Sequence, residues 1–293
     1  MRYFNAPARP PVDPWEPSVF PRANEVALRQ QSVVTTGDMP SRTAYDAFTM
    51  SDIPTLRTDL AAAFRWAARL GMHESIANHF SVATNASGSQ FLLNPVGSHF
   101  SRIRASDLLL LDANDPTTYG GENAPDPTAW HLHAALHSAL PQARCILHTH
   151  MHNATVLCCL KDFEFLMLDQ NACRFYGRIA YDRGYAGMAL DADEGARVAA
   201  LMGAGKSVLF MGNHGVIVVG PTVAQAFDEL YYLEKACALQ VSALATGREL
   251  ALIPEAVART ACGQWNDYPT RFSELHFNAL KTILNQQEPD YQA

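Results

Sequence analysis

The sequence lacks several features that would assign its 293 residues to a well-defined class of proteins. No apolar run approaches the about 20 residues of a membrane-spanning helix, and the first 20 residues contain no apolar signal core. No Lys- or Arg-rich stripe is present and the net charge is −7, so nucleic acid is not expected as a partner. The six cysteines form no Cys-x-x-Cys pair, which favours reduced thiols over a disulfide framework. These absences predict a cytoplasmic protein that binds neither membranes nor nucleic acid.

The chain divides by composition into an arm, a central domain and an extension. Residues 1–50 are rich in proline and lack periodicity, which predicts an extended N-terminal arm. Residues 51–250 alternate between helical and strand-type apolar patterns, as in the helical pattern of 223–247. This alternation predicts an α/β domain with helices on both faces of one sheet. Residues 251–293 are expected to form a C-terminal helical extension.

Three histidines stand at alternate positions where an apolar segment ends, in RCILHTHMHN. Residues i and i+2 of a strand point to the same side, so His148 and His150 face together. They are either a hydrogen-bonded, half-buried pair or two ligands of a divalent metal, which neutral imidazoles bind well. A third ligand would then come from His152 or from His214, which lies in a glycine-bounded turn after another apolar strand.

Four further segments occur in a fixed order along the chain. NHFSVAT is followed by NPVGSHFSRIRASDLLLLD, then by HTH after ALPQARCIL, and then by GNHGVIVVG before TVAQAFDELYYLEKAC. In this combination the chain resembles the class II aldolase/adducin head family from about residue 53 to about residue 245. The resemblance implies a three-layer α/β/α sandwich with one central, mostly antiparallel sheet. It also implies a homotetramer with active sites between adjacent subunits.

The family resemblance also implies a metal site. The two histidines of its HxH motif and the histidine of its NHG motif match His148, His150 and His214 in this sequence. The implied ion is Zn²⁺, with Mn²⁺, Fe²⁺ or Co²⁺ as alternatives because three imidazoles discriminate weakly. His152 lies beyond the motif and is expected to be near the site or at the surface.

The chain differs from the family's aldolases at the position of their acid/base residue and at the positions that bind the substrate phosphate. Ala129 stands where they have an acid/base glutamate, and Pro127 and Thr128 match two small hydroxylated residues that hold the substrate phosphate. His79 and the pair Val96–Gly97 match further phosphate contacts. An ordinary sugar-phosphate aldolase is therefore not expected.

Three functions remain open on this basis. The first is a metal-dependent carbon–carbon lyase, a decarboxylase or retro-aldol enzyme, acting on a small non-phosphorylated hydroxy or keto acid through a metal-stabilised enolate. The second is another metal-assisted reaction in the same pocket, by an epimerase, hydratase or hydrolase. The third is a non-catalytic, adducin-like assembly or binding module. Retention of all three implied metal ligands favours catalysis, and of the catalytic options the lyase depends least on the missing glutamate.

Six residues are candidates for catalysis or substrate binding. His79, or a water that it holds, is expected to return the proton. Asp169 and Asn171 match the region where the aldolases supply a tyrosine across the subunit boundary, and are expected to contribute to catalysis. The expected substrate contacts are Gly97, Thr128 and His99.

Overall fold

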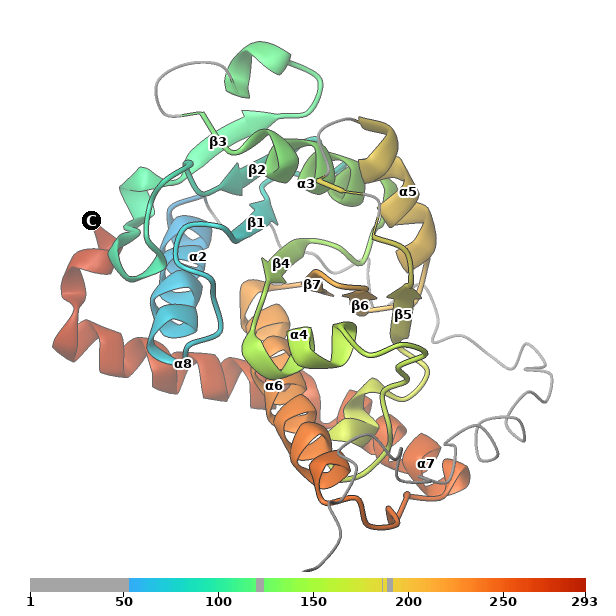
Figure 1. Cartoon of the computed structure of the whole chain (residues 1–293). Helices are drawn as coiled ribbons and strands as arrows, with labels where there is room; N and C mark the ends of the chain where they lie inside the picture. Colours follow the sequence, from blue (N-terminus) through green and yellow to red (C-terminus); the bar gives the residue numbers. More distant parts are fainter. Residues whose placement is uncertain (1–52, 120–123, 186, 189–191) are drawn as a thin grey trace, which may run out of the picture. The chain divides into compact units, whose positions relative to one another are not determined.

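The fold is known from a computed structural model that describes residues 53–119, 124–185, 187–188 and 192–293 (Figure 1). The predicted N-terminal arm, residues 1–50, lies outside the described residues. The α-helices are Ile53–Arg69 (α2), Pro127–Ala139 (α3), His152–Cys158 (α4), Ala192–Met202 (α5), Val223–Ala245 (α6), Glu255–Asp267 (α7) and Pro269–Gln287 (α8). The strands are His79–Ala83 (β1), Gln90–Leu93 (β2), Leu109–Asp112 (β3), Cys145–Thr149 (β4), Ile179–Asp182 (β5), Val208–Met211 (β6) and Gly215–Gly220 (β7).

All seven strands belong to one sheet, in the order β3-β2-β1-β4-β7-β6-β5. Every neighbouring pair is antiparallel except β5 and β6, which are parallel. The structure therefore confirms the predicted central, mostly antiparallel sheet. None of the described helices is both long enough and apolar enough to cross a membrane.

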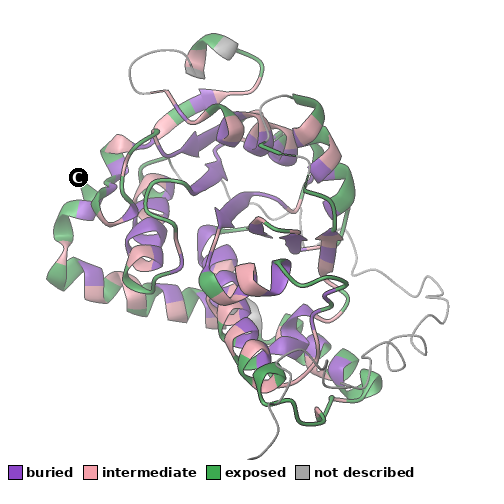
Figure 2. Ribbon diagram, viewed as in Figure 1, coloured by how far each residue is buried: buried purple, intermediate pink, exposed green. Residues whose placement is uncertain are grey.

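Helices cover both faces of the sheet (Figures 1 and 2). Successive side chains of a strand point to opposite faces, so each strand contributes apolar side chains to both layers. On β4, Leu147 packs into the apolar cluster that includes α2, α4 and α6, whereas Ile146 packs into the cluster that includes α3 and α5. The strands are buried on both sides, which explains their nearly continuous apolar sequences. The predicted three-layer sandwich is thus confirmed.

Strand register brings polar residues together on the face covered by α3. His79 of β1 lies opposite His148 of β4, and Ser81 lies opposite Ile146. Since Ile146 belongs to the cluster that includes α3, His79, Ser81 and His148 share that face by strand alternation. An otherwise apolar sheet face therefore carries a polar area near its middle strands.

Helix α3 starts at this polar area. Asp126 caps the helix, since its Oδ1 accepts a hydrogen bond from the backbone N–H of Thr128 at 2.8 Å. Pro127 occupies the first turn, where its missing N–H costs nothing. Residues beyond 250 form α7 and α8, and α8 packs against α2 and α6.

Candidate metal centre

His148 is the most deeply buried of the three predicted metal ligands. It is 2 % exposed near the end of β4, and its Nδ1 lies 3.1 Å from the carbonyl oxygen of Val216. A carbonyl only accepts, so Nδ1–H donates and, in the neutral ring, Nε2 carries a lone pair. Burial, reinforced by neighbouring histidines, lowers the pKa of His148 well below its ordinary value.

His150 is the first residue after β4. Its Nδ1 lies 2.5 Å from Oε2 of Glu74, a residue of the loop after α2. The carboxylate accepts the Nδ1 proton, so the neutral ring again presents an unprotonated Nε2. Glu74 thereby orients His150 as an outer carboxylate orients a metal-binding histidine.

His214 lies in the turn between β6 and β7 and faces the other two rings. Its ring centroid is 4.9 Å from that of His148 and 4.8 Å from that of His150. Burial lowers the pKa of His214 to about 4, with a further contribution from His150. The turn depends on Gly215, where an added Cβ would lie 2.7 Å from Cδ2 of His150 and 2.7 Å from the Thr149 carbonyl oxygen.

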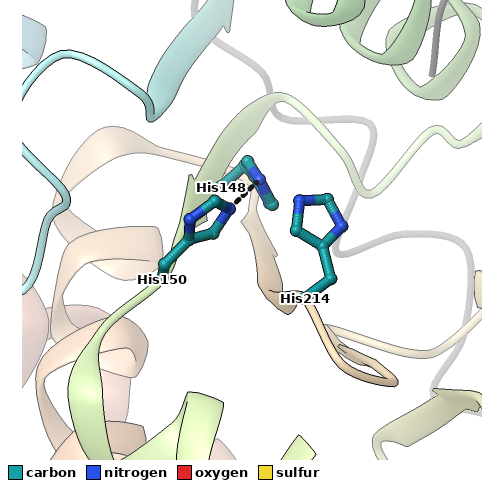
Figure 3. A group of neighbouring side chains, drawn as sticks. All are labelled: His148, His150 and His214. Atoms are coloured by element: carbon teal, nitrogen blue, oxygen red, sulfur yellow. Dashed lines mark hydrogen bonds between the residues drawn. The ribbon is translucent and has the colours of Figure 1, made fainter. Parts of the chain in front are cut away.

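The three histidines converge as predicted and form a group that could hold a metal ion (Figure 3). One ligand atom from each lies within 4.8 Å of the others. The Nε2 atoms of His148 and His150 are 3.2 Å apart. Both rings give their Nδ1 protons to other acceptors, so a proton or a metal ion between the two Nε2 atoms is needed to avoid two opposed lone pairs. Nitrogens bound to one tetrahedral zinc at about 2.0–2.1 Å lie roughly 3.3 Å apart, so the group fits a divalent ion.

A cavity of about 280 Å³ opens beside this group. Of the predicted catalytic and substrate-binding residues, His79 and Thr128 line it. Asp126, Asn78 and Tyr185 also line it and were not predicted. No lysine or arginine is among the described residues of its wall.

The remaining predicted residues lie elsewhere in the single chain. Gly97 and His99 are outside the wall of this cavity, and Nδ1 of His99 is 2.8 Å from Oγ of Ser101. Asp169 and Asn171 are also outside it, and Asp169 accepts a hydrogen bond from the backbone N–H of Ala172. Both were expected to act across a subunit boundary, so their catalytic role stays a prediction.

His152 does not belong to the group of His148, His150 and His214, which is called the metal group below, because the chain turns into α4 at this residue. It begins α4, is exposed, and lines a second cavity whose wall also includes Glu74, His150 and His214. The converging group therefore contains His214 and excludes His152 among the described residues. The residue pattern left His152 and His214 as candidates for the third ligand, and the geometry supports His214.

Glu74 and Asp126 are the functional candidates that sequence reasoning missed. Glu74 lies 76 positions before His150, and an acidic residue in an exposed loop gives no signal of that contact. Asp126 had a local signal, because an Asp before proline and a helical pattern is a typical N-cap. Its position beside the cavity depends on how α3 packs on the sheet.

The comparisons with known proteins agree with this fold. The family model described as the class II aldolase and adducin N-terminal domain matches residues 58–241. The crystal structure of an aldolase II superfamily protein from Pseudomonas syringae is similar, with a TM-score of 0.73 and 33% identity, covering 82% of this chain and 96% of that one.

Curated relatives include proteins of different kinds. Alpha-adducin of Rattus norvegicus is 32% identical over 78% of this chain but only 33% of its own length. Decarboxylase NovR of Streptomyces niveus is 29% identical over 75% of this chain and 82% of its own length. The family match, the fold and the histidine group lead to one conclusion: this chain belongs to the class II aldolase and adducin family.

Proposed function

We propose that this protein is a divalent-metal-dependent carbon–carbon lyase that decarboxylates or cleaves a small, non-phosphorylated hydroxy or keto acid. The observation that carries the proposal is the convergence of His148, His150 and His214 beside a cavity. When bound there, a divalent ion supplies Lewis acidity that favours negative charge on substrate oxygens. Zn²⁺ is the proposed ion, with Mn²⁺, Fe²⁺ or Co²⁺ as alternatives.

The charges around the cavity support a carboxylic acid over a sugar phosphate. The described wall offers the carboxylate of Asp126 and no cationic side chain to balance a phosphate dianion. Oδ1 of Asp126 is fixed by the backbone N–H and the hydroxyl of Thr128, at 2.8 and 2.5 Å. The negative charge of the Asp126 carboxylate is therefore fixed in place and would repel a phosphate group bound beside it.

Ala129 supports chemistry that needs no carboxyl group at the start of α3. It is fully buried and packs in one apolar cluster with Phe91 and Leu93 of β2 and with Trp130 of α3. His79, whose ring is stacked on His148 at 4.7 Å between centroids, is the proposed proton-transfer group instead. Thr128 is the proposed substrate contact at the cavity wall.

We also propose that the active unit is a homotetramer in which a neighbouring subunit contributes Asp169 and Asn171. Support comes from the family relationship and from the position of both residues outside the cavity of their own chain. Light scattering tests the assembly: a tetramer is expected, and a monomer at micromolar concentration would remove this role. A cytoplasmic location is proposed from the six cysteines, all of which are free.

An activity screen with matched substrates tests the proposed reaction. Full-length protein loaded with Zn²⁺ is assayed under argon and in air with hydroxy acids, keto acids and sugar phosphates, following carbon dioxide and carbonyl products. We expect oxygen-independent turnover of an acid and none of sugar phosphates. Metal-loaded protein that turns over no acid in the panel would favour the adducin-like binding module. Cleavage of a sugar phosphate would contradict the proposed substrate class.

A further inference from the structure

A second group of histidines forms a continuous row of hydrogen bonds beside the metal group. Nδ1 of His79 lies 2.7 Å from Nε2 of His133. Nδ1 of His133 is hydrogen-bonded to Oγ of Ser81, which lies 2.7 Å from Nε2 of His137. The row ends where Nδ1 of His137 meets the Ala143 carbonyl oxygen at 2.7 Å. All four side chains are buried.

The Ala143 carbonyl fixes the direction of every hydrogen bond in this row. A carbonyl only accepts, so His137 donates through Nδ1–H. Burial lowers the pKa of His137 to about 3, so the ring is neutral and its Nε2 accepts from the Ser81 hydroxyl. Since Ser81 has a single hydroxyl proton, its oxygen must accept the remaining bond, from Nδ1–H of His133.

The same reasoning extends to the cavity. Burial lowers the pKa of His133 well below its ordinary value, so this ring is neutral and its Nε2 accepts from Nδ1–H of His79. His79 is also buried, and none of the described carboxylates is hydrogen-bonded to its ring, so its single proton is on Nδ1 and its Nε2 carries a lone pair. No described residue is hydrogen-bonded to Nε2 of His79, and His79 lines the cavity. The cavity wall therefore holds a hydrogen-bond acceptor at this position.

We propose that Nε2 of His79 accepts a hydrogen bond from a hydroxyl group of the substrate, so that the pocket selects hydroxy acids over keto acids of the same carbon skeleton. Ser81, His133 and His137 are positioning residues that hold His79 in this tautomer. The inference rests on the proposed function for its ligand class, whereas the tautomer follows from the hydrogen bonds and from the neutral state of the buried rings. It refines the expectation that His79 returns a proton, because the resting ring must first receive one at Nε2.

The tautomer is measured directly by NMR of the zinc-loaded protein with ring-¹⁵N-labelled histidine, with the His79→Gln spectrum assigning the signal of His79. The expected result is an unprotonated Nε2 and a protonated Nδ1. In Ser81→Ala the row is interrupted, and the Nε2 signal should move toward the protonated position. Ser207→Ala is the matched control, because the Ser207 hydroxyl is also buried but has no hydrogen-bond partner among the described residues. A protonated Nε2 of His79 in the unmodified protein would overturn the proposal, even if Ser81→Ala does not fold.

Calorimetry with lactate and pyruvate tests the ligand class on the same zinc-loaded protein. The ratio of the two affinities cancels effects common to both acids. We expect the affinity for lactate divided by the affinity for pyruvate to fall about 2- to 10-fold in Ser81→Ala. The same ratio should stay unchanged in Ser207→Ala. An unchanged ratio in Ser81→Ala would overturn the selection of hydroxy acids. Failure of the lyase assay with the expected tautomer and ratio would instead count against the proposed reaction alone.

Discussion

Two groups of histidines lie side by side on one sheet face, and they use the same residue type in opposite ways. In the row from His79 to His137, each donor meets an acceptor until the row reaches the cavity. In the metal group, His148 and His150 donate their Nδ1 protons to other acceptors, and their Nε2 atoms face each other. The comparison indicates that hydrogen-bond direction, rather than the presence of histidine, distinguishes rings that could bind a metal from rings of a polar core.

Removing one ring of the metal group should have the largest effect. His150→Ala deletes a ligand, so zinc affinity should fall by more than the about 10- to 100-fold that is typical for loss of an outer partner. His152→Ala is the matched control, since this histidine is two residues away, is exposed and lies outside the converging group. Competition with a chromophoric chelator measures both affinities. Equal losses in the two variants would contradict the assignment.

Interrupting the row should reduce stability without removing the metal. His137→Leu leaves the Ser81 hydroxyl and the Ala143 carbonyl without their buried partner, which should lower the free energy of unfolding by about 1–3 kcal/mol. Urea denaturation measures this loss, and elemental analysis should show unchanged zinc content. Loss of zinc from the folded variant would mean that the two groups do not act independently.

Weakening the orientation of His150 should have the smallest effect. Glu74→Gln replaces the carboxylate that accepts the Nδ1 proton with a neutral amide, so zinc affinity should fall about 10-fold, the low end for outer partners. The low end is expected because the Glu74 side chain is 64% exposed. The same chelator competition measures the change. An unchanged affinity would contradict the role of Glu74 in orienting His150 for the metal.

The sequence was sufficient to predict the sheet and the convergence of three histidines. The HTH and GNHG segments each carry their histidines at strand ends, and His148, His150 and His214 do converge. The row was not predicted, although His133 and His137 are spaced i, i+4 and therefore share a helix face. Their partner Ser81 is set by the register of β1 on β4 and by the packing of α3, which depend on long-range contacts.

X-ray absorption spectroscopy on protein purified without chelator tests the metal centre most directly. The account predicts one zinc ion per chain with three imidazole nitrogens at about 2.0–2.1 Å in the wild-type protein. In His214→Ala the spectrum should show one imidazole fewer, or the ion should be lost. A zinc environment dominated by sulfur, or a spectrum unchanged in His214→Ala, would contradict the assignment of His148, His150 and His214 as the metal ligands.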